Sequence, residues 1–151
     1  METKQLTEVL DQQYLNLKKL LGVVTDKQRA LVERNIGKLE ECIRQEEKIL
    51  LNIQSVEKRR YEIITDLMHN LGLKETDFML NSILPKLKES VSKNDFALLS
   101  KYEMEIKETA AKITEINERN KFLIQHSRQF INETISTLLN SKKDSILDRK
   151  G

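Results

Sequence analysis

Residues 95–139 read DFALLSKYEMEIKETAAKITEINERNKFLIQHSRQFINETISTLL, and this stretch decides the fold because one helix accounts for all of it. Its apolar or small side chains recur every three, four or seven residues, which places them in one stripe along a helix. The stripe consists of Leu99, Tyr102, Ile106, Ala110, Ile113, Ile116, Leu123, Phe130 and Thr134. The stretch therefore predicts one long helix that packs along a seam.

The second half of this helix carries a wider apolar surface and less charge. From residue 122 onward a second set of apolar side chains joins the stripe: Phe122, Ile124, Ile131, Ile135, Leu138 and Leu139. Between residues 129 and 139 the single charged residue is Glu133. One neighbouring helix cannot cover an apolar arc of this width, so the arc predicts burial within a bundle or on a partner.

Two further long helices are predicted before this one. Residues 3–34 carry a heptad-like seam, and residues 36–70 form a second amphipathic helix with Leu39, Ile43 and Leu50 expected to point inward. Between them, Asn35 and Gly37 lower the helix propensity and predict a tight reversal. One unbroken helix from residue 3 to residue 70 is the alternative.

A shorter third helix and a tail complete the prediction. Gly72 ends the second helix, because glycine tolerates a positive φ. The third helix is expected to start at Thr76 and Asp77 and to kink at Pro85, and Ser92 or Asn94 is expected to cap the long helix. At 1.5 Å per residue the long helix outreaches the first two by several turns. Residues 1–139 are expected to form the bundle, and residues 140–151 a flexible tail.

The composition indicates an all-α protein and disfavours several functional classes. The chain has 151 residues, 33% of them charged, with one Pro, four Gly and no Trp, which predicts an elongated antiparallel helical bundle or coiled coil of three long helices and one shorter helix. The 26 Lys and Arg residues alternate with 24 Asp and Glu residues, so no nucleic-acid partner is expected. We expect no membrane insertion and a cytoplasmic location, because the chain shows neither a signal peptide nor the roughly 18 consecutive apolar residues of a spanning helix.

Few side chains are of a kind that supports catalysis or metal binding. The chain has two His, no glycine-rich phosphate loop and no nucleophile motif, so we expect no enzyme activity, no metal and no cofactor. Asp66 and His69 are spaced like half of a carboxylate-bridged metal site, but the chain has no second pair of this spacing. Cys42 is the one cysteine and is expected to pack as a small apolar side chain.

Two asparagines, Asn117 and Asn120, lie at or beside the seam of the long helix. Asn in such a position costs stability and is tolerated where it fixes the register of packed helices or makes a polar contact. The sequence leaves two interpretations open: the asparagines fix the register of packed helices, or they contact a partner.

The order of motifs along the chain points to a family. The relevant residues are Ala30, Leu31, Asn35, Leu39, Leu50, Glu57 and Arg60, followed by Asn117 and Asn120 ahead of Leu123 and Ile124. In this order, and over nearly its whole length, the chain resembles the FlgN-type flagellar export chaperones. Tails of that family commonly place a tyrosine shortly before a glycine, whereas this chain has Ile146 and Leu147.

The resemblance implies a cytoplasmic chaperone that binds hook-filament junction proteins, prevents their premature assembly and delivers them to the export gate and ATPase complex of the type III export apparatus. An apolar groove around the last helix would take an amphipathic helix of such a substrate. The expected partner-binding residues are Asn117, Asn120, Phe122, Leu123, Ile124, Phe130, Ile131, Ile135, Leu138, Leu139, Ile146 and Leu147. The alternative is a homo-oligomeric coiled-coil scaffold, or a homodimer, in which the same face pairs with its own copy.

Overall fold

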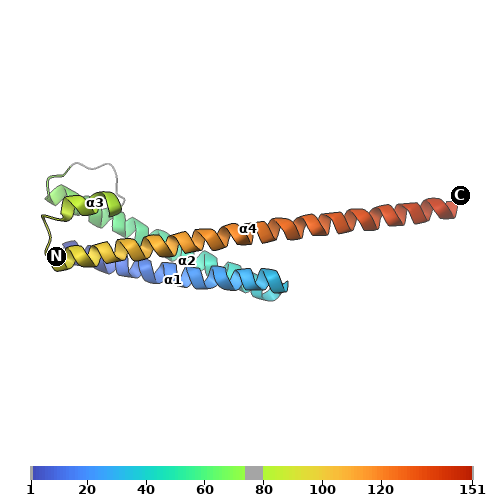
Figure 1. The fold of residues 1–151 in the computed structure, drawn as a ribbon, viewed down its shortest axis with the longest axis horizontal. Coiled ribbons are helices and arrows are strands. Elements are labelled where there is room, and N and C mark those ends of the chain that lie inside the picture. Colours follow the sequence, from blue (N-terminus) through green and yellow to red (C-terminus); the bar gives the residue numbers. More distant parts are fainter. Residues whose placement is uncertain (1, 74–79, 151) are drawn as a thin grey trace.

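A computed structural model describes the backbone of residues 2–73 and 80–150, and the side chains of residues 3–73 and 82–140. Four helices follow one another along the chain: α1 (Glu2–Glu33), α2 (Ile36–Asn70), α3 (Leu80–Leu87) and α4 (Lys93–Lys150). The prediction of an all-α bundle with three long helices and one short helix is confirmed. Figure 1 shows an elongated molecule in which α4 extends far beyond the other helices.

The central helix of the bundle is α1, which packs against both α2 and α4. It runs antiparallel to α2 but parallel to α4, and two contacts between α1 and α4, with a third from Arg34 just after α1, establish this direction. Near the start of both helices the Tyr102 hydroxyl donates to Asp11 Oδ1 at 2.8 Å. Further along, Asn120 lies against Val24 and then Phe130 lies against Arg34, so residue numbers rise together in the two helices.

The core consists of two clusters arranged along the bundle. The larger one contains Leu6, Val9, Leu10, Val56, Ile63, Ile64, Leu67, Met68, Ile83, Leu84, Leu87 and Leu99, and includes side chains of all four helices. The smaller one lies closer to the α1–α2 reversal and contains Leu20, Val24 and Ile113, with Ile116 packed at its edge. Buried apolar packing therefore decreases toward the reversal, and α3 covers only the opposite end of the bundle.

The reversal between α1 and α2 lies at Arg34 and Asn35, as the sequence predicted for Asn35. The main-chain N–H of Asn35 donates to the Ala30 carbonyl at 2.9 Å, and Arg34 has a left-handed φ of 56°. The Asn35 side chain then accepts the N–H of Lys38 at 3.1 Å and so caps α2. Gly37 is the second residue of α2 and takes no part in the turn.

The remaining helix ends follow the predicted chemistry where they are described. Gly72 ends α2 with a φ of 68°, and its N–H donates to the His69 carbonyl at 3.0 Å. Thr76 and Asp77 lie outside the described residues. Pro85 lies inside α3, which ends two residues later. The Ser92 hydroxyl accepts the N–H of Asp95 at 3.1 Å, so Ser92 rather than Asn94 caps α4.

Two predictions about the helices were wrong. Ile43 and Leu50 were expected to point inward, but both are exposed, because α2 packs on α1 through a different face that includes Cys42 and Val56. The long helix was expected to end at Leu139, but α4 continues to Lys150, since residues 140–150 contain no Gly or Pro to interrupt it. The division into a bundle and a flexible tail stays a prediction.

Candidate functional site

The candidate site lies on the part of α4 that extends beyond the α1–α2 reversal. The Arg34 guanidinium lies 5.6 Å from the centre of the Phe130 ring, and this contact marks where the other helices end beside α4. The 20 residues that follow, 131–150, are here called the α4 overhang. At 1.5 Å per residue the overhang is about 30 Å long. Figure 1 shows this segment running past the end of α1 and α2.

Over residues 131–140, whose side chains are described, one face of the overhang is apolar and is uncovered by the described part of the chain. Its exposed large apolar side chains are Ile131, Ile135, Leu138 and Leu139, with exposed fractions from 49% to 63%. Phe130, which begins the same surface, is 52% exposed although Arg34 lies over its ring. Large side chains of this kind are buried in most folded proteins, so a contiguous exposed group indicates an interaction surface.

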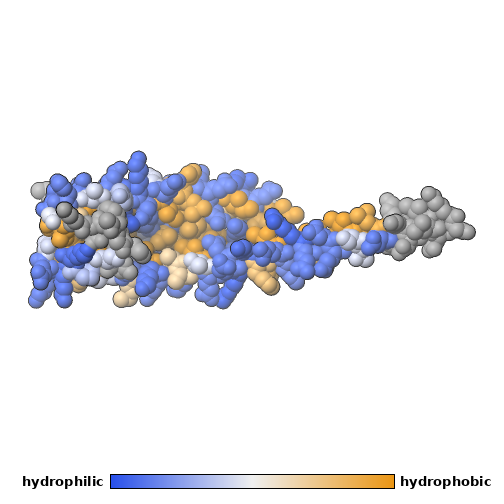
Figure 2. All heavy atoms as spheres, turned by 90° about the horizontal axis from the view of Figure 1, so that it is seen from above, coloured by the Kyte–Doolittle hydropathy of each residue, from blue (hydrophilic) through white to orange (hydrophobic). Residues whose placement is uncertain are grey.

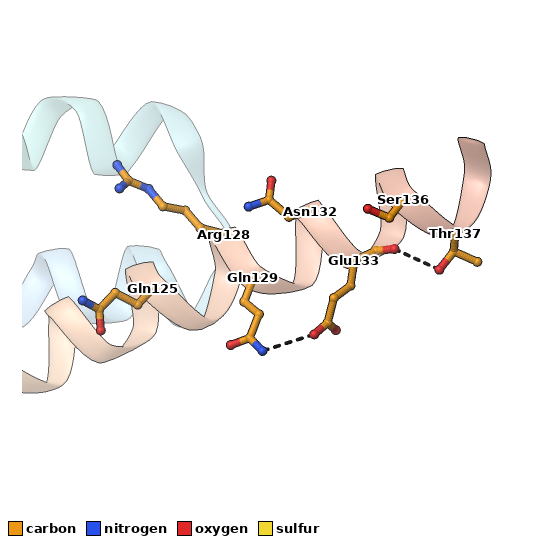
Figure 3. A pocket seen from close by; sticks show the side chains of 7 residues that line it. All are labelled: Gln125, Arg128, Gln129, Asn132, Glu133, Ser136 and Thr137. Carbon is orange, nitrogen blue, oxygen red and sulfur yellow. Dashed lines mark hydrogen bonds between the residues drawn. The ribbon is translucent and has the colours of Figure 1, made fainter. Parts of the chain in front are cut away.

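Polar side chains of α4 lie along residues 125–137, and Figure 3 shows seven of them. A shallow hollow on α4 is lined by Gln125, Arg128, Gln129, Asn132, Glu133, Ser136 and Thr137. Gln129 Nε2 donates to Glu133 Oε1 at 3.1 Å, and the Thr137 hydroxyl donates to the Glu133 carbonyl at 2.9 Å. Because these groups bond within one helix, they need no partner. The segment is therefore amphipathic, and only one of its faces calls for a covering element.

The predicted site residues before the overhang fall into three environments. Asn117 is exposed, whereas Asn120 is 2% exposed and donates to the Val24 carbonyl at 3.0 Å. Asn120 thus belongs to the inside of the bundle and has no surface to offer a partner. Leu123 and Ile124 are partly buried at the end of the bundle. Phe122 is 65% exposed and stacks on the His126 ring at 5.9 Å.

Ile146 and Leu147 complete the predicted set. Both lie on the described backbone of α4, near its end, but outside the residues whose side chains are described. Their part in binding stays a prediction.

A second exposed apolar surface, which the sequence analysis missed, lies on α2. Ile36, Ile43 and Leu50 follow one another at seven-residue spacing, so they share one face of the helix, and Leu51 extends it. We call these four exposed residues the α2 stripe. The seven-residue spacing was visible in the sequence, but an inward-facing seam has the same spacing. Figure 2 shows apolar surface both along the bundle and on the extended part of α4.

A partly buried polar network also joins α1 to α2. The buried Gln13 side chain donates through Nε2 to the Ile53 carbonyl and to Glu57 Oε2, both at 3.3 Å. Arg60 Nε donates to the same Glu57 oxygen at 2.9 Å. These hydrogen bonds from Arg60 hold the pKa of the Glu57 carboxyl below its ordinary value. The network fixes the pairing of the two helices rather than forming an open site.

Three side chains were considered for metal binding or reactivity, namely Asp66, His69 and Cys42. Asp66 and His69 are both exposed on α2, and no group of three or more His, Cys, Asp or Glu within the described residues is placed to hold a metal ion. Cys42 is buried, and burial raises the pKa of its thiol. Among the described residues, no helix contains an apolar segment long enough to cross a membrane.

Comparison with known proteins identifies the family of the chain. A family model described as FlgN protein matches residues 1–150, which is nearly the whole chain. No curated protein and no solved structure matches it. The family match covers all four helices, including the α4 overhang.

Proposed function

Because the chain belongs to the FlgN family of flagellar export chaperones, we propose that it binds hook-filament junction proteins in the cytoplasm, keeps them from assembling prematurely and delivers them to the type III export apparatus. The observation that carries this proposal is the amphipathic α4 overhang. Its apolar face, from Ile131 to Leu139, is 49% to 63% exposed at its large side chains and has no covering helix in the described part of the chain.

The overhang fits an amphipathic helix as its partner. Ile131, Ile135 and Leu138 follow the i, i+4, i+7 spacing with which a helix presents anchors to the apolar face of another helix. Burying a large apolar side chain contributes roughly 1.5–3 kcal/mol, so a few half-exposed anchors supply enough energy for a reversible complex. Reversible binding suits a chaperone that must release its substrate at the export gate.

The same contact explains how premature assembly is prevented. The family resemblance implies that junction proteins assemble through amphipathic helices near their termini. A terminal helix that lies on the α4 overhang has its apolar face covered and cannot pair with another junction protein. The end of α4, with Ile146 and Leu147, is our candidate for contact with the export gate or the ATPase complex.

The test is size-exclusion chromatography with light scattering on the full chain mixed with a purified junction protein. We expect one complex that contains both proteins, and we expect the junction protein to stay unassembled in it. A junction protein from which the terminal helices have been removed is the matched control and should elute separately. Separate elution of the intact junction protein, or an equal complex with the truncated one, would contradict the proposal.

The alternative of a homo-oligomeric scaffold gives a different result in the same measurement. A scaffold has no need of a junction protein, so its mass would stay the same in the presence and absence of that protein.

A further inference from the structure

We propose that the α2 stripe is a docking surface for one helix of a coiled-coil protein whose apolar seam is flanked by lysine or arginine. The stripe lies on α2, apart from the α4 overhang, so this inference goes beyond the proposed function and concerns a different partner. Its four side chains have exposed fractions between 38% and 71%: Ile36, Ile43, Leu50 and Leu51.

The stripe is uncovered because α2 turns only one side toward the bundle. Among the described residues, the backbone of α2 lies close to that of α1 but not to that of α4. Cys42 and Val56 are buried on the side that meets α1. Ile43 follows Cys42 by one residue, which turns its side chain by about 100° around the helix axis. The core therefore leaves this second apolar row of α2 in solvent.

The geometry of the stripe favours a helix as its occupant. Three of its residues recur every seven positions, which is the repeat of a coiled-coil seam. In a coiled coil, each apolar side chain of one helix enters a hole formed by four residues of the facing helix. The spacing of such a hole is i, i+3, i+4 and i+7, because these residues are neighbours on a helix surface. A shallow hollow on α2 has this spacing and is lined by Glu47, Leu50, Leu51 and Gln54.

The charges beside the stripe indicate the chemistry of the partner. Glu40 and Glu47 are exposed, and each lies within about 60° of Ile43 around the helix. Neither forms an ion pair with another described residue. The basic residues of the same segment lie about 100° or more from Ile43, namely Lys38, Arg44 and Lys48. The apolar row is thus bordered on one side by unpaired carboxylates, which lysine or arginine beside the seam of a partner helix complements.

The stripe and the overhang run in opposite directions from the α1–α2 reversal, as Figure 1 shows. The stripe extends back along the bundle for about 21 Å, from Ile36 to Leu50, whereas the overhang leaves the bundle. A helix on the stripe therefore leaves the overhang accessible. The chain can then hold an exported partner and a coiled-coil partner at the same time.

The test measures the binding of two labelled peptides to the full chain by fluorescence anisotropy. Both peptides have about 21 residues, with isoleucine and leucine at the seam positions of three heptads. The basic peptide carries lysine beside the seam, and the acidic peptide carries glutamate there, so that repulsion between like charges opposes the pairing of each peptide with itself. We expect the basic peptide to bind with a dissociation constant on the order of 10 μM, and the acidic peptide to bind about tenfold more weakly.

Two pairs of substitutions locate the peptide on the stripe. Ile43→Ser with Leu50→Ser should weaken binding of the basic peptide on the order of 100-fold. Leu15→Ser with Met104→Ser is the matched control, because both residues are exposed and lie outside the stripe, and it should bind equally well. Glu40→Lys with Glu47→Lys should reverse the preference, so that the acidic peptide binds more tightly than the basic one. A chain that fails to fold cannot give this reversal.

Equal binding of the two peptides, or unchanged affinity in the Ile43 and Leu50 variant, would overturn the proposal. Loss of binding in Ile135→Ser with Leu138→Ser would also overturn it, because the peptide would then lie on the overhang. Analytical ultracentrifugation should give the same mass for the unchanged chain and for the Ile43 and Leu50 variant. A lower mass of the variant would show that a second copy covers the stripe, which contradicts the proposal. No junction protein takes part in these measurements, so their outcome is independent of the proposed function.

Discussion

The Nδ2 amide of Asn120 on α4 donates a hydrogen bond of 3.0 Å to the main-chain carbonyl of Val24 on α1, with the Asn120 side chain 2% exposed. This contact lies between the smaller core cluster and the start of the overhang. A buried polar side chain with a directional partner favours one register of two packed helices over its neighbours. The register determines how much of α4 extends beyond the reversal and is therefore exposed to a partner.

A first prediction separates the two asparagines. Asn120→Asp should lower the free energy of unfolding by about 3 kcal/mol or more near neutral pH, because it removes the donor to Val24 and buries a carboxylate. Asn117→Asp, one turn earlier and exposed, should change it by less than about 0.5 kcal/mol. Chemical denaturation followed by circular dichroism measures both. Equal losses for the two variants would contradict the assignment of Asn120 to the inside of the bundle.

A second prediction concerns two glycines, whose replacement by alanine should change the stability of the protein in opposite directions. Gly72→Ala should destabilise the protein by about 1–2 kcal/mol, because Gly72 has a φ of 68° and alanine is strained in that region. Gly37→Ala should stabilise it by about 0.5–1 kcal/mol, because Gly37 lies in α2 and alanine is the better helix former. The added Cβ at residue 37 would meet Asn35 Oδ1 at 3.8 Å, an ordinary contact distance. Thermal unfolding measures the stability of both variants. If both substitutions stabilise the protein, or both destabilise it, the described helix ends are refuted.

A third prediction concerns acid stability. The pKa of Glu57 is lower in the folded chain than its ordinary value of 4.5, mainly because Arg60 donates hydrogen bonds to the carboxylate. The unfolded chain therefore binds more protons here than the folded chain, and stability rises with pH. This contribution is present above pH 4.5 and is lost as the pH falls through the lowered pKa. Glu57→Gln should make stability less dependent on pH in this acid range. The control Glu115→Gln removes one partner of an exposed ion pair with Arg119 and should leave that pH dependence unchanged.

Much of the fold was readable from the sequence because apolar side chains recur at helical spacing. The stripe that begins at Leu99 predicted the long helix, and Asn35 predicted the reversal, because asparagine lowers the helix propensity. That Arg34 would adopt the left-handed conformation was not predictable, because glycine or asparagine usually fills this position and Arg34 does so beside the Phe130 ring. Gly37 was misleading, since it lies inside α2.

The candidate site was partly predictable, because part of it is visible as a local sequence pattern. Sparse charge between Gln129 and Leu139 identified the apolar surface of the overhang, and a local pattern is enough for that. Whether Asn120 faces a partner or a neighbouring helix depends on the register of α1 against α4, which no local pattern encodes. The exposure of Ile43 and Leu50 likewise depends on which face of α2 meets α1, because a seven-residue repeat is the same for an inner and an outer stripe.

The central claim is that the α4 overhang binds the exported partner, and calorimetric titration of a hook-filament junction protein tests it most directly. The variant is Ile135→Ser with Leu138→Ser, and the matched control is Leu15→Ser with Met104→Ser, since all four residues are about half exposed and only the first pair lies on the overhang. Circular dichroism should show that both variants keep their helix content. We predict that the overhang variant binds on the order of 100-fold more weakly than the unchanged chain, a loss of about 3 kcal/mol, while the control binds equally well. Unchanged affinity in the folded overhang variant would contradict the account.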